Sequence, residues 1–250
     1  MEKIKISVVS YLNSKPFIYG LQHSEVINAI DLQLDIPSVC AQKLVDGQVD
    51  IGLIPVAVIP QLKEYHIISD HCIGAEGKVA SVMLYSDVPL QEIKTVLLDY
   101  QSRTSVTLVK VLAQHFWKIS PEWIKAEANY ESTIGGATAA VIIGDRTFGL
   151  EGNYKFVYDL AEEWQKFTQL PFVFACWVAN KKLPDDFLSA FNKALQLGLD
   201  SRPQLVKQIT AEKTYNTDVD VYLNKSISYS LTAAKRRALE LFLSYLEQLS

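Results

Sequence analysis

The chain has 250 residues, of which 49% are apolar, and its 28 acidic and 24 basic side chains give a net charge of −4. This composition is typical of a globular protein, and the length allows the core to divide in two. Acidic side chains outnumber basic ones, and the chain has only one short basic run, at 235–237. Both features argue against a nucleic-acid partner. No apolar run reaches the roughly 18 residues that a membrane span needs, and no signal-peptide pattern starts the chain, so we expect a cytoplasmic, soluble protein.

The cysteine and glycine patterns argue against several cofactors. Cys40, Cys72 and Cys176 are far apart and form no CxxC pair, so buried thiols are expected rather than disulfides. His66 and His71 lie close to Cys72, but no second pair of ligands follows, so no metal site is expected. No GxGxxG or phosphate-binding loop occurs, and no nucleotide cofactor is expected either.

Asn13 follows the first predicted strand. Alternating apolar residues predict this strand over residues 3–9 and a second over 32–36. Between them Pro16 suits the first turn of a short helix that Asn13 or Ser14 would cap. Because open α/β sheets bind ligands beyond the carboxyl ends of their strands, Asn13 is a candidate ligand-binding residue, with a plain helix cap as the alternative.

The next predicted elements complete a strand–helix–strand unit and lead to a strand whose apolar run contains Ser81. A helix and then a short strand at residues 50–55 complete the strand–helix–strand crossover of a mostly parallel sheet. Residues 65–70 and 79–85 are predicted as further strands. From the residues alone, a serine such as Ser81 is more often tolerated inside a strand than functional.

Residues 96–108 concentrate polar groups at a predicted helix start. A buried strand leads into a turn with Ser102 and Arg103, and Thr104 or Ser105 is the expected N-cap. Hydroxyls, unpaired N–H groups and a guanidinium at the positive end of a helix dipole form an anion receptor, for which a carboxylate is the expected occupant. The equally weighted alternative is an ordinary cap with a solvated arginine.

The last part of the chain alternates strands and helices before becoming wholly helical. Residues 139–143 predict a buried strand that ends in Gly144 and Asp145, again placing a polar group at the carboxyl end of a strand. Apolar spacing predicts a strand-to-helix segment at 157–164, an extended run at 171–178, and helices beginning near 184, 203 and 234.

This order of elements predicts two lobes. We expect residues 1–86 and 178–250 to form the first lobe and 87–177 the second. Extended crossings near 85–90 and 172–178 would act as a hinge. Such a molecule is an α/β clamshell that closes on a small ligand.

Several stretches resemble, in family order, the chorismate dehydratases of the futalosine route to menaquinone. They cover residues 4 to about 180, whereas the helical tail is only generically similar. The resemblance implies a two-lobed, periplasmic-binding-protein-like fold of type II (a Venus flytrap) that acts in the cytoplasm without a cofactor. One departure is Gly135-Gly136, where the family more often has bulkier or acidic residues. The stretches are Ser10-Tyr11-Leu12-Asn13-Ser14, Asp50-Ile51-Gly52-Leu53-Ile54-Pro55, Ser102-Arg103-Thr104-Ser105, Ile143-Gly144-Asp145 and Leu170-Pro171-Phe172-Val173-Phe174-Ala175-Cys176-Trp177.

The resemblance implies a hydro-lyase that removes water from chorismate to give 3-[(1-carboxyvinyl)oxy]benzoate. Asn13 and Ser81 match positions where the family places polar groups on the substrate, and they are the candidate catalytic pair. Asn13 would hold charge that develops at the reacting ring, and Ser81 would hydrogen-bond the departing hydroxyl or a carboxylate. Because the matching stretches supply no obvious protein base, the expected base is the substrate's own enolpyruvyl carboxylate.

The expected substrate-binding residues combine this analogy with the helix-terminus argument. Arg103 pairs either with a substrate carboxylate or with Asp145 or Asp99, and the sequence leaves these alternatives open. The full set is Ser102, Arg103, Thr104, Ser105, Gly144 and Asp145.

Two other functions are compatible with the same fold. One is an intracellular carboxylate-binding protein. The other is 1,4-dihydroxy-6-naphthoate synthase of the same pathway, whose Ser-Pro-Cys-Pro-Asn-type motif differs from residues 10–14 here. The oligomeric state is left open.

Overall fold

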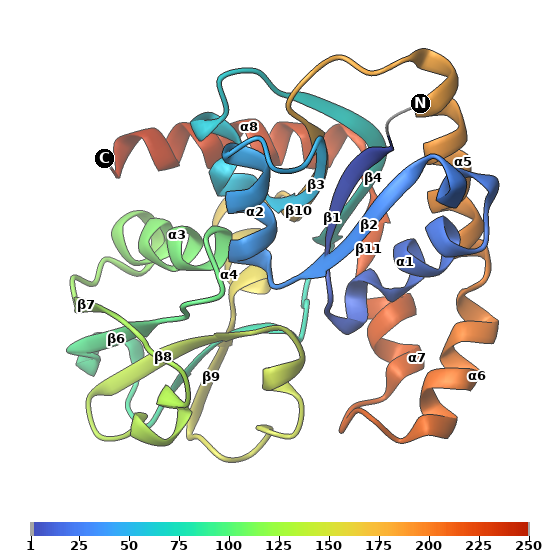
Figure 1. Ribbon diagram of the computed structural model, residues 1–250. Helices are drawn as coiled ribbons and strands as arrows, with labels where there is room; N and C mark the ends of the chain where they lie inside the picture. Colours follow the sequence, from blue (N-terminus) through green and yellow to red (C-terminus); the bar gives the residue numbers. More distant parts are fainter. Residues whose placement is uncertain (1–2, 250) are drawn as a thin grey trace.

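The computed structural model describes residues 3–249 and has two lobes, each built on one β-sheet (Figure 1). No helix in this described part of the chain is long and apolar enough to cross a membrane. The six-stranded sheet has the order β11 (Ser228–Ser230), β4 (His66–Ala75), β10 (Phe172–Ala179), β3 (Ile51–Pro55), β1 (Ile4–Val9) and β2 (Ile30–Asp35). The five-stranded sheet has the order β7 (Glu122–Lys125), β6 (Thr95–Leu98), β8 (Thr138–Ile143), β5 (Val82–Ser86) and β9 (Phe156–Asp159).

Both sheets are mixed rather than mostly parallel. In the six-stranded sheet β1 runs parallel to β2 and β3, with Ile6 opposite Leu32 and Ile51, while β10 pairs antiparallel with β3 and β4. Helix α2 (Pro37–Val45) connects β2 to β3 and confirms the predicted crossover. In the five-stranded sheet β6 is parallel to β7 and β8, and β5 is antiparallel to β8 and β9.

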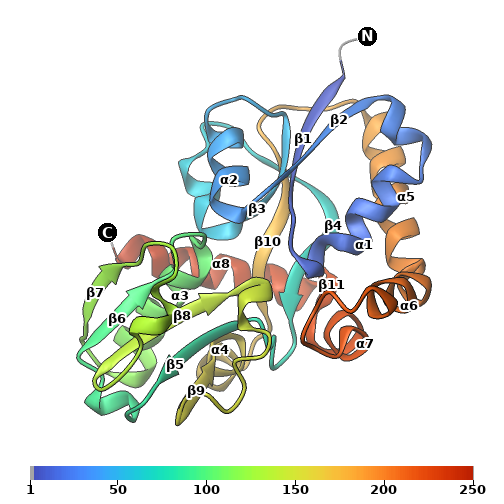
Figure 2. The same cartoon turned by 60° about the horizontal axis from the view of Figure 1, so that its bottom comes forward.

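Two strands belong to different sheets from those that the sequence suggested. Residues 82–86 were expected in the first lobe, but as β5 they pair with β8 and β9. Residues 172–177 were expected in the second lobe, but as part of β10 they pair with β3 and β4. The chain therefore crosses between the sheets before β5 and again before β10 (Figure 2). Periodicity identifies such apolar strands but carries no information about which sheet they join.

Helices α1 (Lys15–Gln22) and α5 (Asp185–Asp200) pack against each other beside the six-stranded sheet. Their contact needs glycine, because a Cβ on Gly198 would lie 1.8 Å from the Pro16 carbonyl oxygen. Neither Asn13 nor Ser14 caps α1 through its side chain. A short 3-10 turn at Leu12–Ser14 runs directly into the helix, so the expected cap is absent and Asn13 is available for other contacts.

The five-stranded sheet carries α3 (Thr104–Val111), which continues into a π-helical turn at Leu112–Trp117, and α4 (Leu160–Thr168). The Asp159 carboxylate caps α4 by accepting the N–H groups of Ala161 at 3.0 Å and Glu162 at 3.2 Å. This cap matches the strong preference of helix starts for aspartate.

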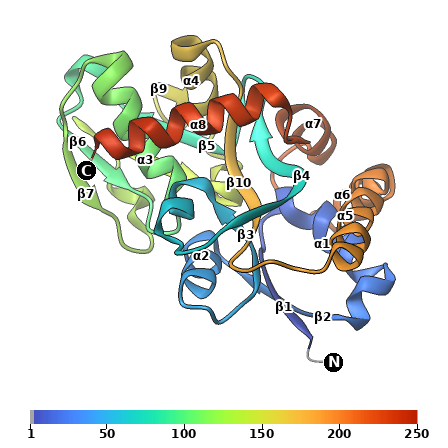
Figure 3. The same ribbon diagram turned by 90° about the horizontal axis from the view of Figure 1, so that it is seen from above.

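The C-terminal segment returns to the first sheet and then crosses both lobes. It comprises α6 (Arg202–Glu212), α7 (Val219–Val221), a π-helical turn at Tyr222–Ser226, β11 and α8 (Ala233–Gln248). Figure 3 shows α8 lying across the two lobes. Its Phe242 packs edge-on against Trp164 of α4 and Phe172 of β10, with ring centroids 6.1 and 5.1 Å away. Helix α8 therefore buries apolar surface from each lobe.

Candidate functional site

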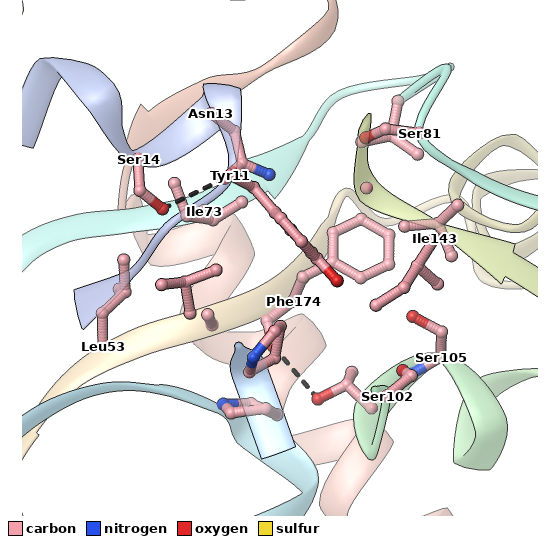
Figure 4. A pocket seen from close by; sticks show the side chains of 18 residues that line it. Tyr11, Asn13, Ser14, Leu53, Ile73, Ser81, Ser102, Ser105, Ile143 and Phe174 are labelled. Atoms are coloured by element: carbon pink, nitrogen blue, oxygen red, sulfur yellow. Dashed lines mark hydrogen bonds between the residues drawn. The ribbon is translucent and has the colours of Figure 1, made fainter. Parts of the chain in front are cut away.

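A cavity lies between the two lobes and contains about 560 Å³ of empty volume, part of which is open to solvent (Figure 4). The six-stranded lobe contributes residues that follow β1 and residues of β3, β4 and β10, and the five-stranded lobe contributes residues before β5, at the start of α3 and after β8. The lining residues are Val9, Tyr11, Asn13, Ser14, Pro37, Leu53, Pro55, Ile73, Val79, Ser81, Val82, Ser102, Thr104, Ser105, Ile143, Gly144, Phe174 and Ala175.

None of these 18 lining residues is charged. Hydroxyl groups and one amide supply the polar part of the lining, and aliphatic side chains with Phe174 supply the rest. Such a lining suits a ligand with an apolar ring and several hydrogen-bond acceptors. Within residues 3–249, no three His, Cys, Asp or Glu side chains are grouped so that they could hold a metal ion.

Asn13 and Ser81 face the cavity from different lobes and share one hydrogen-bond partner. The Tyr222 hydroxyl donates to Ser81 Oγ at 2.8 Å, and Asn13 Nδ2 donates to the Tyr222 oxygen at 3.4 Å. The fold thus brings together the two residues that the sequence paired. Tyr222, which connects them, was not singled out, because its position 141 residues from Ser81 gives no local signal.

The backbone before Ser81 is held in an unusual conformation. Ala80 has a φ of +61°, in the left-handed region that side chains other than glycine rarely adopt. Asp159 Oδ2 stabilises this turn by accepting the N–H groups of Val79 at 2.9 Å and Ala80 at 2.8 Å. One carboxylate therefore caps α4 and also fixes the turn that delivers Ser81 to the cavity.

The start of α3 contributes three hydroxyl residues to the lining. Arg103 occupies the N-cap position without a side-chain cap, and Ser102 Oγ, one residue earlier, accepts the Ser105 N–H at 3.0 Å, so the expectation that Thr104 or Ser105 caps the helix was wrong. The three-residue separation of Ser102 and Ser105 is the spacing at which a side chain reaches a first-turn N–H. Thr104 Oγ1 donates to the Phe174 carbonyl at 3.0 Å and accepts the Ala57 N–H at 3.3 Å, which ties α3 to the other lobe.

Arg103 lies outside the cavity. Its side chain is exposed, it lines a separate surface hollow beside α2, and its Nη1 contacts the Ser102 carbonyl at 3.4 Å. The two carboxylates that the sequence left open as partners of Arg103 bind other groups instead. Asp99 forms an ion pair with Arg146 and accepts the Tyr130 hydroxyl at 2.9 Å, while Asp145 binds the Leu12 backbone.

Asp145 lies just behind the lining and connects the two lobes. Its carboxylate oxygens accept the Leu12 N–H at 3.1 and 3.2 Å. Burial raises the pKa of Asp145 to about 6, and the Leu12 hydrogen bond lowers it only in part. Asp145 therefore contributes to the contact between the lobes rather than to the cavity surface.

Tyr11 extends across the cleft (Figure 4). Its ring lies against Gly144. Gly144 has a φ of +65°, and a Cβ at this position would lie 2.5 Å from the Tyr11 ring. The Tyr11 hydroxyl donates to Gln101 Oε1 in the other lobe. Burial raises the pKa of Tyr11, so the phenol stays protonated at neutral pH. Tyr11 and Gln101 lie within the stretches that the sequence emphasised, but their contact depends on the meeting of the lobes.

The Gly135-Gly136 pair does not contribute to the cavity lining. Gly135 pairs with Thr138 in a tight turn before β8, and Gly136 takes a φ of +55° there. The two glycines therefore form a turn. Their departure from the family pattern does not affect the cavity lining.

Two mixed α/β lobes, joined by two crossings and separated by a small-molecule cavity, define a periplasmic-binding-protein-like fold. Solved structures of proteins from several organisms share it. A protein from Archaeoglobus fulgidus has a TM-score of 0.77 at 12% identity, covering 99% of this chain and 97% of that one. A Candida albicans protein described as having the generic periplasmic binding protein fold has a TM-score of 0.62 at 11% identity, with coverages of 99% and 94%. The alkanesulfonate-binding protein of Xanthomonas axonopodis pv. citri, bound to MOPS, has a TM-score of 0.64 at 12% identity, with coverages of 97% and 93%.

Sequence comparison narrows this class to one family. Residues 4–248 match the family described as menaquinone biosynthesis, and the chain belongs to that family. The chain is also 25% identical over 221 residues to a chorismate dehydratase of Thermus thermophilus, covering 80% of this chain and 79% of the relative. The resemblance noted in the sequence is thereby confirmed.

Proposed function

We propose that the protein is a chorismate dehydratase that converts chorismate into 3-[(1-carboxyvinyl)oxy]benzoate and water. The ring carbon that bears the enolpyruvyl ether loses a proton, and the adjacent carbon loses hydroxide. Membership of the menaquinone biosynthesis family and the likeness to a chorismate dehydratase support this reaction. The cytoplasmic location expected from the sequence stays a prediction.

The observation that carries the proposal is an uncharged cavity with Asn13 and Ser81 facing it from opposite lobes. Elimination from chorismate is driven by formation of an aromatic ring, so it requires positioning and local charge stabilisation more than a strong base. A cavity with hydroxyl and amide groups on one part and aliphatic walls on another provides both. Its apolar wall packs against the substrate ring, and its hydroxyl groups hydrogen-bond to the substrate oxygen atoms.

The roles of the residues follow from their positions. The Asn13 amide donates to negative charge that develops at the ring, and the Ser81 hydroxyl donates to the departing hydroxide. The first turn of α3, with Ser105 in the lining, receives a substrate carboxylate, because N–H groups at a helix start have no acceptor within the helix and favour anions.

The proposed base is the enolpyruvyl carboxylate of the substrate. No carboxylate, histidine or lysine is among the lining residues. The two carboxylates that follow strands beside the cavity already have partners, Asp99 with Arg146 and Asp145 with the Leu12 N–H. A carboxylate that the substrate itself carries, held next to the reacting C–H, supplies a base at high effective concentration.

The test is incubation of the purified protein with chorismate, followed by ultraviolet absorbance and by proton NMR of the aromatic product. We expect turnover by the wild-type protein. We expect Asn13→Ala and Ser81→Ala each to lower kcat by on the order of a hundredfold, the usual effect of losing a donor to transition-state charge. Asn28→Ala and Ser132→Ala, on exposed side chains, are matched controls that retain turnover.

Different failures have different meanings. A double variant of Asn13 and Ser81 with near-normal turnover would remove both residues from the mechanism. Wild-type protein that binds chorismate in calorimetry without forming product would favour the carboxylate-binding alternative. Absence of both binding and product would favour the naphthoate synthase of the same pathway.

A further inference from the structure

The C-terminal segment inserts a buried tyrosine behind the proposed catalytic pair. Tyr222 is 2% exposed and begins the π-helical turn at Tyr222–Ser226. Its ring packs edge-on against Phe148, with centroids 5.0 Å apart and an interplanar angle of 79°. This packing directs the hydroxyl group toward the contact between the lobes, where it reaches both Asn13 and Ser81.

The directions of these hydrogen bonds follow from the donors available. The Asn13 amide nitrogen has only hydrogens to offer, so the Tyr222 oxygen accepts from it. The buried Tyr222 hydroxyl hydrogen would lack an acceptor unless it is donated to Ser81 Oγ, and an unpaired buried donor is costly. Ser81 Oγ is then an acceptor from Tyr222, which leaves its own hydrogen available to a group in the cavity.

We propose that Tyr222 is a positioning residue that fixes the Asn13 amide and turns the Ser81 hydroxyl hydrogen toward the substrate. The inference rests on the proposed dehydratase function. It gives the C-terminal segment a role in the reaction, because Tyr222 orders one donor from each lobe without touching the substrate itself.

The surroundings of Tyr222 support this role. A second buried tyrosine of the same segment, Tyr229, donates its hydroxyl to the Asn13 carbonyl at 2.9 Å. Arg202 holds the segment in place by donating to the Leu223 carbonyl at 3.2 Å and lying over the Tyr229 ring. Burial raises the pKa of Tyr222, so its phenol keeps the proton that it donates.

The kinetic test is Tyr222→Phe, which keeps the ring and removes the hydroxyl. We expect kcat to fall about tenfold or more, because the two donors lose their alignment, while KM stays within about twofold. The matched control is Tyr215→Phe. Tyr215 also packs against Phe148, and its hydroxyl makes no hydrogen bond within the described residues. We expect this control to retain kcat.

A double-mutant comparison separates positioning from a general structural effect. If Tyr222 acts through Ser81, adding Tyr222→Phe to Ser81→Ala costs much less than it does in the wild-type background. An equal additional loss of kcat in the Ser81→Ala background, or an unchanged kcat for Tyr222→Phe alone, would overturn the inference.

A second measurement does not depend on turnover. The side-chain amide resonance of Asn13, assigned by its loss in Asn13→Ala, should shift in Tyr222→Phe and stay in place in Tyr215→Phe. Inactive wild-type protein would reject the proposed function, whereas an unmoved Asn13 amide resonance would reject the positioning role whatever the activity.

Discussion

The raised pKa of Asp145 leads to a quantitative prediction about how the free energy of unfolding depends on pH. Burial raises this pKa from 3.8 to about 6 in the folded protein. A carboxyl group with a raised folded-state pKa stabilises the fold at low pH, and that contribution is lost as the pH rises from about 4 through 6. Wild-type stability should therefore carry a penalty above pH 6 that is much smaller near pH 4.

The size of this penalty follows from the two pKa values. A rise from 3.8 to about 6, at about 1.36 kcal/mol per pKa unit, amounts to about 3 kcal/mol. Asp145→Asn keeps an oxygen that can accept the Leu12 N–H but does not titrate. We expect the stability of this variant relative to wild type to rise by up to about 3 kcal/mol between pH 4 and pH 7.5. For a chain of this size that corresponds to roughly 6–12 °C in Tm.

The assay is chemical denaturation of both proteins at half-unit pH intervals from 4 to 7.5, with thermal melts alongside. Asp31→Asn, which removes a charge from an exposed side chain, is the control and should show a difference that varies little with pH. The reasoning is refuted if the difference between Asp145→Asn and wild type is constant with pH, or if it falls as the pH rises.

Two further substitutions test the geometry of the cleft. Gly144→Ala should cost about 1–2 kcal/mol from its left-handed backbone, and it should lower kcat/KM about tenfold or more, because the new methyl group would displace the Tyr11 ring. Gly47→Ala has a similar φ of +69° with nothing within 4 Å, so it should lose stability but keep its activity; equal kcat/KM in both variants would show that the Tyr11 contact is dispensable. Arg103→Ala should change kcat/KM by less than about twofold, because the side chain is exposed and lies outside the cavity. A tenfold loss would instead place the guanidinium on the substrate.

Local patterns in the sequence predicted several residues that line the cavity. The polar residues after β1, at the start of α3 and after β8 were recognised because each follows a strand or opens a helix. Asn13, Ser81, Ser102, Thr104, Ser105 and Gly144 all line the cavity. The choice of Asn13 and Ser81 as a pair came from the family resemblance, because a lone asparagine or serine has no distinctive local pattern.

What the sequence determined by itself was most of the elements and the presence of polar groups at their ends, since periodicity and capping preferences act over only a few residues. It missed β11 in a segment predicted as wholly helical, and it placed Ser81 inside a strand that in fact begins at Val82. The tertiary structure decided which sheet β5 and β10 join, because any buried apolar strand can pair with several neighbours. It also decided that Arg103 faces solvent, that Asp145 binds the Leu12 backbone and that Tyr222 meets Ser81. These outcomes depend on contacts between residues far apart in the chain, and only the packing of the two lobes and the C-terminal segment fixes them.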